Sequence, residues 1–260
     1  MTSIATLTLN PTIDVSFEVD RVFHTHKMRG RSERHDPGGG GINVARVFVR
    51  LGGNARCYYL SGGATGAALD GLLDLHQLVR TRITVAGETR VSTSVLERSS
   101  GREYRFVTDG PRVTPDEWER ALELVAEAQC DYLIASGSLP PGVPDDFYAR
   151  VAAVAHERGV RFVLDSSGRG LAGGLAGRGV YLVKPSLGEL RSLTGAELAD
   201  DDAIAAAATT IVQRDKAKYV AVTMGRDGAM LVSAYGVLRL PAVPGCGAVG
   251  GEARPAGLLQ

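Results

Sequence analysis

The sequence contains few cysteines, and they form no recognisable pairing or metal-binding pattern. Three occur among 260 residues, Cys57, Cys130 and Cys246, and they lie far apart. An odd number without short spacings argues against a disulfide framework and against a zinc site. We therefore expect reduced thiols in a cytoplasmic protein.

An excess of charge of either sign is also missing. Lys and Arg number 29 and Asp and Glu number 29, so the formal net charge is zero. The composition therefore does not indicate a nucleic-acid partner. No apolar run reaches the roughly 20 residues that span a bilayer, and the first residues are typical of a strand rather than a signal peptide. We expect no membrane partner.

Glycine, in contrast, is abundant, and its densest stretch is Asp36–Gly53, DPGGGGINVARVFVRLGG. Four glycines, Gly38–Gly41, precede a pattern of apolar residues at helical spacing. Glycines let a ligand approach the backbone, and a helix N-terminus offers unpaired N–H groups. Asn43, in the first turn, adds a polar side chain. A glycine run taken alone would more often be a flexible loop, but together with its neighbours this stretch predicts a ligand site.

The chain begins with a predicted strand at Ile4–Leu9, which ends at Asn10-Pro11. Asp14 follows this strand. The carboxyl ends of strands are where α/β folds place ligand-binding groups. An Asx turn explains Asp14 equally well when the residue is considered alone.

From residue 114 onward, helical and strand patterns alternate. The run Thr114-Pro115-Asp116-Glu117 predicts a helix start, with Thr as N-cap and Pro at the first position. We expect helices at 114–129, 145–158, 187–193 and 201–214, strands at 132–135, 162–164, 180–183 and 219–223, and a closing hairpin at 229–233 and 237–240. This alternation predicts an α/β fold with a parallel sheet covered on both faces.

Two segments of alternating strands, at about 15–35 and 87–110, do not fit this pattern. We expect them to form a small β-sheet lid inserted into a single domain of residues 1–260. The lid carries Lys27, Arg29, Arg90 and Arg105. Isolated surface arginines are usually solvated, but together these side chains would suit an anion such as phosphate if the lid covers the main sheet.

Polar, glycine-rich turns follow four predicted strands, at Ser136–Gly142, Asp165–Gly170, Lys184–Leu190 and Thr223–Gly228. The carboxyl ends of parallel strands meet at one edge, so these turns predict an open crevice. Any one of them alone is a weak indication. A cationic lid opposite a second phosphate site indicates phosphoryl transfer between a nucleotide and a phosphorylated small molecule.

The order of these motifs resembles the ribokinase-like sugar kinases, specifically their phosphofructokinase-B branch. The 6-phosphofructokinases are most similar, with 1-phosphofructokinase and tagatose-6-phosphate kinase nearby. The matching segments are Thr6–Asp14, Pro37–Arg46, Leu51–Gly53, Gly62–Gly66, Gly101–Pro111, Ser136–Val143, Asp165–Gly168, Val183–Leu190 and Val222–Ala229. Their common order along the chain is far more specific than any single motif.

The resemblance implies an α/β/α sandwich with a mostly parallel sheet and a β-lid that serves for homodimerisation. It also implies phosphorylation of a sugar phosphate, foremost fructose 6-phosphate, by ATP with Mg²⁺. It assigns the sugar phosphate to Asp14, Lys27, Arg29, Gly38, Gly39, Asn43, Arg90 and Ser138. It assigns the nucleotide to Lys184, Ser186, Thr223, Gly225 and Gly228. Glu189 would act on magnesium through water, and the family's Asn is replaced by Ser186, which we expect to weaken metal positioning.

The segment after Pro244 departs from the family. The family's V-G-A-G-D motif supplies an anion hole and a catalytic base, whereas Ala248–Glu252 resembles it with one residue fewer and Glu in place of Asp. Glu252 is the candidate for the displaced base, and no intact catalytic residue is expected. A frameshift or an early stop near residue 244 would explain the departure. We therefore expect a poor kinase, with a non-catalytic sugar-phosphate-binding remnant as the alternative.

Overall fold

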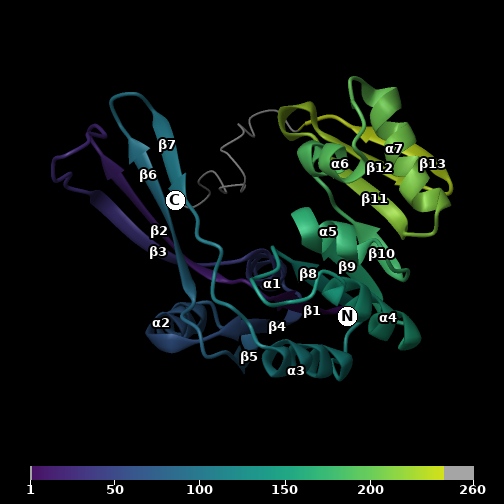
Figure 1. Ribbon diagram of the computed structural model, residues 1–260, viewed down its shortest axis with the longest axis horizontal. Helices are drawn as coiled ribbons and strands as arrows, with labels where there is room; N and C mark the ends of the chain where they lie inside the picture. The colour runs from purple at the N-terminus through teal and green to yellow at the C-terminus, as the bar shows by residue number, and fades with distance from the viewer. Residues whose placement is uncertain (1, 243–260) are drawn as a thin grey trace.

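The computed structural model of the protein describes residues 2–242, which contain one large and one small β-sheet (Figure 1). The large sheet has nine strands in the order β13-β12-β11-β10-β9-β8-β1-β4-β5. The strands are β1 (Ser3–Thr8), β4 (Asn54–Ser61), β5 (Val79–Thr84), β8 (Tyr132–Ser136), β9 (Arg161–Asp165), β10 (Val180–Val183), β11 (Ala217–Thr223), β12 (Ala229–Ser233) and β13 (Gly236–Leu240). Neighbours from β5 to β11 pair in parallel, and β12 and β13 add an antiparallel hairpin.

Helices cover the large sheet on both faces. They are α1 (Gly40–Arg50), α2 (Gly63–Asp74), α3 (Pro115–Ala126), α4 (Phe147–Glu157), α5 (Gly168–Gly174), α6 (Leu187–Thr194) and α7 (Asp201–Gln213). One buried cluster joins α1 and α2 to the sheet through Ile42 and Leu69. The other joins the remaining helices through residues such as Phe147 and Ile204. This three-layer arrangement confirms the predicted ribokinase-like α/β/α fold.

The small sheet is the lid, and it projects from the large sheet (Figure 1). Its order is β3-β2-β6-β7, with β2 (Thr12–Val19), β3 (Arg31–Gly38), β6 (Arg90–Glu97) and β7 (Arg102–Phe106). The lid begins at residue 12 rather than about 15, so Asp14 lies inside a lid strand. Gly38 ends β3 and Gly39 is the N-cap of α1, so the helix begins within the glycine run, not after it.

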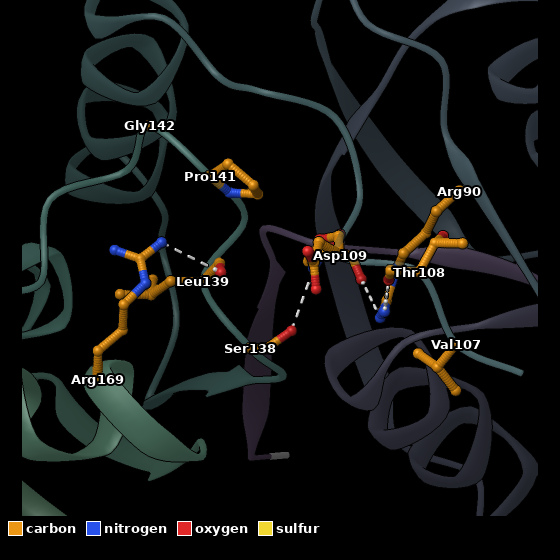
Figure 2. A pocket seen from close by; sticks show the side chains of 10 residues that line it. Arg90, Val107, Thr108, Asp109, Ser138, Leu139, Pro141, Gly142 and Arg169 are labelled. Carbon is orange, nitrogen blue, oxygen red and sulfur yellow. Dashed lines mark hydrogen bonds between the residues drawn. The ribbon is translucent and has the colours of Figure 1, made fainter.

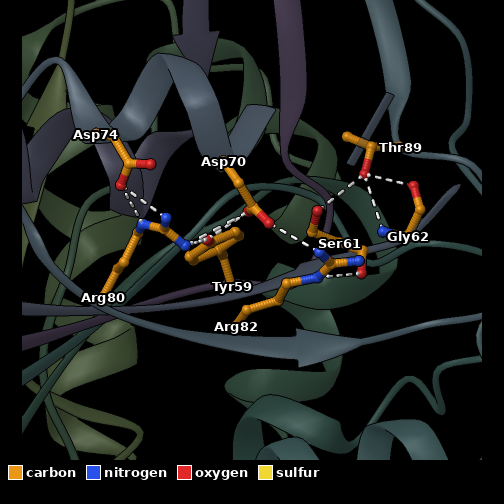
Figure 3. Close-up of polar contacts among 8 residues, drawn as sticks. All are labelled: Tyr59, Ser61, Gly62, Asp70, Asp74, Arg80, Arg82 and Thr89. Atoms are coloured by element: carbon orange, nitrogen blue, oxygen red, sulfur yellow. Dashed lines mark hydrogen bonds and ion pairs between the residues drawn. The ribbon is translucent and has the colours of Figure 1, made fainter. Parts of the chain in front are cut away.

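A polar network fastens α2 to the edge of the large sheet (Figure 3). The Tyr59 hydroxyl on β4 donates to the Asp70 carboxylate at 2.6 Å. From β5, Arg82 donates to Asp70 at 2.8 Å and Arg80 donates to Asp74 at 2.7 Å. Because α2 also contacts lid strands β2 and β3, the network holds in place the helix against which the lid packs.

The predicted start of α3 is confirmed by its hydrogen bonds. The Thr114 N–H donates to one oxygen of the Glu117 carboxylate at 2.7 Å. The other oxygen accepts from the Ala86 N–H, also at 2.7 Å. Glu117 therefore also binds the segment that connects β5 to the lid. None of the helices within residues 2–242 combines the length and apolar character that crossing a bilayer requires.

Candidate active site

The carboxyl ends of β8, β9 and β10 are joined by a chain of polar contacts. The Ser136 hydroxyl donates to the Asp165 carboxylate at 3.0 Å, and Lys184 Nζ lies 2.9 Å from the other oxygen of that carboxylate. A Cβ built on Gly40 would lie 1.9 Å from Ser136 Oγ, so only glycine allows the first turn of α1 to approach this chain. The glycine run and the lysine therefore belong to one continuous edge.

Beside this edge, a pocket of about 550 Å³ lies between the large sheet and the base of the lid (Figure 2). Its lining comes from the ends of β1, β6, β7 and β8 and from α5. The lining residues are Asn10, Arg90, Val107, Thr108, Asp109, Ser138, Leu139, Pro141, Gly142 and Arg169. Two of the predicted sugar-phosphate residues, Arg90 and Ser138, thus meet in one pocket.

Arg90 binds the backbone where the chain crosses between the two sheets. Its Nη2, Nε and Nη1 donate to the carbonyls of Asn10 (3.0 Å), Pro11 (3.4 Å) and Thr108 (2.9 Å). Arginine has five N–H donors, so two remain after the bonds formed within residues 2–242. Burial lowers the pKa of Arg90, while the carboxylates of Asp14 and Asp109 act in the opposite direction, and an arginine side chain keeps its charge in proteins. The guanidinium therefore stays charged and is suited to an anion.

Asn10 was not predicted as a site residue, because its place before proline indicated only a turn. It is 3% exposed. Its Nδ2 donates to Ser138 Oγ at 3.1 Å and to the Asp109 carbonyl at 2.9 Å. It therefore ties the loop after β8 to the segment that leaves the lid.

Asp14, Gly38 and Gly39 lie beside the strand pair that carries Arg90: Gly38 pairs with Thr12, which also pairs with Arg90. A Cβ on Gly38 would be 2.1 Å from Asp14 Oδ2, so glycine makes room for that carboxylate. Gly39 has φ of +118°, and its Cβ would lie 3.3 Å from Cα of Pro11, whose carbonyl accepts from Arg90. Asn43 lies in the first turn of α1.

The Asn43 Oδ1 accepts from Arg46 Nη1 at 3.3 Å. Arg46 also donates to the Pro37 carbonyl at 3.1 Å. Asn43 is thus oriented by a side chain that also holds the end of lid strand β3. This supports its predicted place beside the glycines.

Lys27 and Arg29 are not brought to this pocket within one chain. They are exposed and lie between β2 and β3, at the far end of the lid. Arg90 pairs with Thr12, whereas the far end begins after Val19, about 23 Å away at the rise of a strand. The expected convergence of all lid cations within one chain is therefore not observed, because β2 runs away from the large sheet.

The predicted nucleotide-binding residues do lie together at the ends of β10 and β11. Ser186 pairs with Thr223, and the Thr223 N–H donates to the Pro185 carbonyl at 3.0 Å. The following turn needs positive φ at Gly225 (58°) and Gly228 (91°). Next to Lys184, this turn leaves backbone exposed along the same edge as the pocket that Arg90 and Ser138 line.

Glu189 forms a capping box at the start of α6. Its carboxylate accepts from the Ser186 N–H at 2.7 Å, and its own N–H donates to Ser186 Oγ at 3.3 Å. Within residues 2–242, no three His, Cys, Asp or Glu side chains gather as a metal site. Ala248–Glu252, with the candidate base Glu252, lies outside the described residues.

Comparison with known proteins shows the family and the fold of the chain. The ATP-dependent 6-phosphofructokinase isozyme 2 of Mycobacterium tuberculosis is 41% identical over 243 residues, which are 93% of this chain and 71% of that relative. The 1-phosphofructokinase of Xanthomonas campestris pv. campestris is 32% identical over 236 residues, 87% of this chain and 73% of the relative.

A solved structure with the same fold is phosphofructokinase-2 from Escherichia coli in complex with fructose-6-phosphate. It has a TM-score of 0.88 and 37% identity, and the match covers 94% of this chain and 81% of that one. Residues 2–249 match the family described as pfkB family carbohydrate kinase. The chain therefore belongs to the pfkB family of carbohydrate kinases.

Proposed function

We propose that this protein transfers the γ-phosphate of ATP to fructose 6-phosphate and forms fructose 1,6-bisphosphate, with low turnover because Ala248–Glu252 departs from the family's catalytic motif. The observation that carries the proposal is the pocket in which Arg90 and Ser138 meet beside Asp14. The guanidinium would bind the phosphate already on the sugar, because N–H forks suit phosphate oxygens. The Asp14 carboxylate, next to Gly38, would accept hydrogen bonds from sugar hydroxyls.

The nucleotide would lie along the ends of β10 and β11. Lys184 would bind a phosphate as a point charge, and the turn from Gly225 to Gly228 would let the nucleotide approach the backbone. Magnesium usually keeps several waters and takes one or two carboxylates in addition to phosphate oxygens. The carboxylates of Glu189 and Asp165, on this edge, suit magnesium binding of this kind. Mg²⁺ would neutralise charge on the transferred phosphoryl group.

Turnover assays with several acceptors test the proposal. ATP-dependent ADP release should be greatest with fructose 6-phosphate and should be absent with unphosphorylated fructose. Greater activity with fructose 1-phosphate or tagatose 6-phosphate would assign the chain to one of those related activities instead. Sugar-phosphate binding without ADP release would support the non-catalytic alternative, and activity on ribose alone would contradict the proposal.

We further propose a homodimer formed through the lid, in the cytoplasm where ATP and sugar phosphates are found. Large apolar side chains are exposed on and around the lid, namely Phe23, Met28, Val91, Phe106 and Val107. A second copy would cover these side chains. Lys27 and Arg29 would also need a second copy to reach a pocket, since the pocket of their own chain is distant. The E. coli phosphofructokinase-2 has been solved as a tetrameric inhibited form. Light scattering at micromolar concentration should show a dimer or a multiple of it, and a stable monomer would contradict this proposal.

A further inference from the structure

The loop Ser136–Gly142 carries Ser138 into the pocket but forms few hydrogen bonds of its own. It contains Pro140 and Pro141, which have no N–H to donate. The Val143 N–H, directly after the segment, donates to the Pro140 carbonyl at 3.4 Å. The conformation of this loop must therefore be imposed by the elements that surround it.

The two ends of the loop have their own anchors. The Gly137 carbonyl accepts from the Tyr148 hydroxyl at 3.1 Å and from Ser166 Oγ at 2.9 Å. The Pro141 carbonyl accepts from the Val113 N–H at 2.8 Å. The Ser138 hydroxyl accepts from Asn10 Nδ2, but none of these bonds reaches the backbone of Leu139 and Pro140 in the middle of the loop.

Arg169, from the first turn of α5, holds the middle of the loop (Figure 2). Its Nη2 donates to the carbonyls of Leu139 (3.3 Å) and Pro140 (2.7 Å). Its Nη1 donates to the Val143 carbonyl and to the Asp145 carboxylate, both at 2.7 Å. Four of its five N–H groups are thus used within residues 2–242. Although the side chain lines the pocket, its donors serve the loop rather than a ligand.

We propose that Arg169 is a positioning residue for sugar-phosphate binding. By holding the carbonyls of Leu139 and Pro140, it keeps Ser138 opposite Arg90, at the distance that Asn10 spans. The inference rests on the proposed function, since the ligand is the sugar phosphate. It assigns to Arg169 an effect on sugar-phosphate affinity that is transmitted through Ser138 and does not extend to the nucleotide side.

A double-mutant cycle tests the proposal, with fructose 6-phosphate and a non-hydrolysable ATP analogue as probes. The variants are Arg169→Ala, Ser138→Ala and the pair, with Arg120→Ala as a matched exposed arginine control on α3. Arg169→Ala should weaken fructose 6-phosphate binding about 10- to 100-fold, because small misplacements are costly. Binding of the ATP analogue should stay within about twofold of wild type, as it should for Arg120→Ala. In the Ser138→Ala background, the effect of Arg169→Ala should shrink to about threefold or less, since coupled residues are not additive.

Arg169→Lys and Asp145→Asn keep the test decisive if Arg169→Ala fails to fold. Lysine cannot form the same fork, so Arg169→Lys should weaken sugar-phosphate binding nearly as much as alanine, whereas Asp145→Asn keeps three carbonyl bonds and should have a small effect. A folded Arg169 variant with wild-type affinity, or an undiminished effect in the Ser138→Ala background, would overturn the proposal. Failure of the wild type to bind any ketohexose phosphate would instead overturn the proposed function, and this inference with it.

Discussion

Gly40 shows how one residue fixes the distance between the two halves of the candidate site. Its Cα lies against Ser136, whose hydroxyl binds Asp165, the partner of Lys184. A side chain at Gly40 would force α1 away from the edge or displace Ser136, which is 2% exposed. The sequence indicated the glycine run as important but not which glycine makes this contact.

We expect Gly40→Ala to lower the free energy of unfolding by about 1–3 kcal/mol, the usual range for overpacking a core. Gly71 is the matched control, because it lies inside α2 with open space around its Cα. Gly71→Ala should raise stability by roughly 0.5–1 kcal/mol. Urea unfolding of both variants measures the difference. Equal effects of the two substitutions would show that α1 does not approach Ser136 as described.

Ser186 offers a second test at single-residue scale. It occupies the position of the Asn that its family resemblance leads us to expect, and it is the N-cap of α6. Asn caps helices as well as Ser does, so Ser186→Asn should leave thermal stability unchanged. If the amide helps to position magnesium, the Mg²⁺ concentration for half-maximal nucleotide binding should fall by roughly tenfold, the lower end of outer-shell effects on metals. An unchanged Mg²⁺ requirement would show that Ser186 does not limit metal positioning.

At the scale of elements, the lid is held at each of its four connections to the large sheet. Arg90 binds the carbonyls at the entry to β2 and at the exit from β7, and it is itself the first residue of β6. Arg46 binds Pro37 near the end of β3. A ligand that binds Arg90 therefore contacts the residue that joins three of these connections.

The link into β6 also depends on Glu88, whose carboxylate caps α2. It accepts from the Thr65 hydroxyl at 2.8 Å and from the N–H groups of Thr65 (3.1 Å) and Ala64 (3.3 Å). The hydrogen bond from the Thr65 side chain is the main cause that lowers the Glu88 pKa below its ordinary value of 4.5. A depressed carboxyl pKa stabilises the fold above pH 4.5, and that stabilisation is lost as pH falls through the folded value.

We therefore expect Glu88→Gln to lower the unfolding temperature at pH 7 and to have a smaller effect at pH 3, which lies below the ordinary carboxyl pKa. As the pH falls, the wild-type carboxyl takes up a proton and ceases to bind the helix as an anion. Thermal unfolding followed by circular dichroism at both pH values measures this. The same difference at the two pH values would mean that the charge of Glu88 does not matter to α2.

At the scale of the whole molecule, the sequence was sufficient to predict most elements of the large sheet. The strand expected at 180–183 is β10, and the helix expected from 187 is α6 with one further residue. Few folds other than a helix-covered parallel sheet are compatible with buried apolar strands that alternate with capped helices. Strand β5 was not predicted, because its residues Val79–Thr84 alternate polar and apolar side chains like the lid strands that follow.

The site was predicted where function depends on local motifs, and not where it depends on contacts between distant segments. Arg90 and Ser138 were predicted together and share a pocket. Asn10 and Arg169 act through backbone carbonyls of loops far away in sequence, which no local pattern reveals. Lys27 was expected in the same pocket, but β2 carries it to the far end of the lid. The sequence pattern does not show whether its side chain reaches the pocket of a second copy.

The proposed function depends most directly on Arg90 as the anion-binding residue of a sugar-phosphate pocket. Calorimetry with fructose 6-phosphate should show binding by the wild type and a loss of about 1.5–3 kcal/mol for Arg90→Ala, the range for a charged hydrogen bond. This corresponds to a rise in Kd of about 10- to 160-fold. Arg102→Ala, on the exposed strand β7 of the same lid, should bind as the wild type does. Equal affinity of a folded Arg90→Ala variant and the wild type would contradict the proposed function.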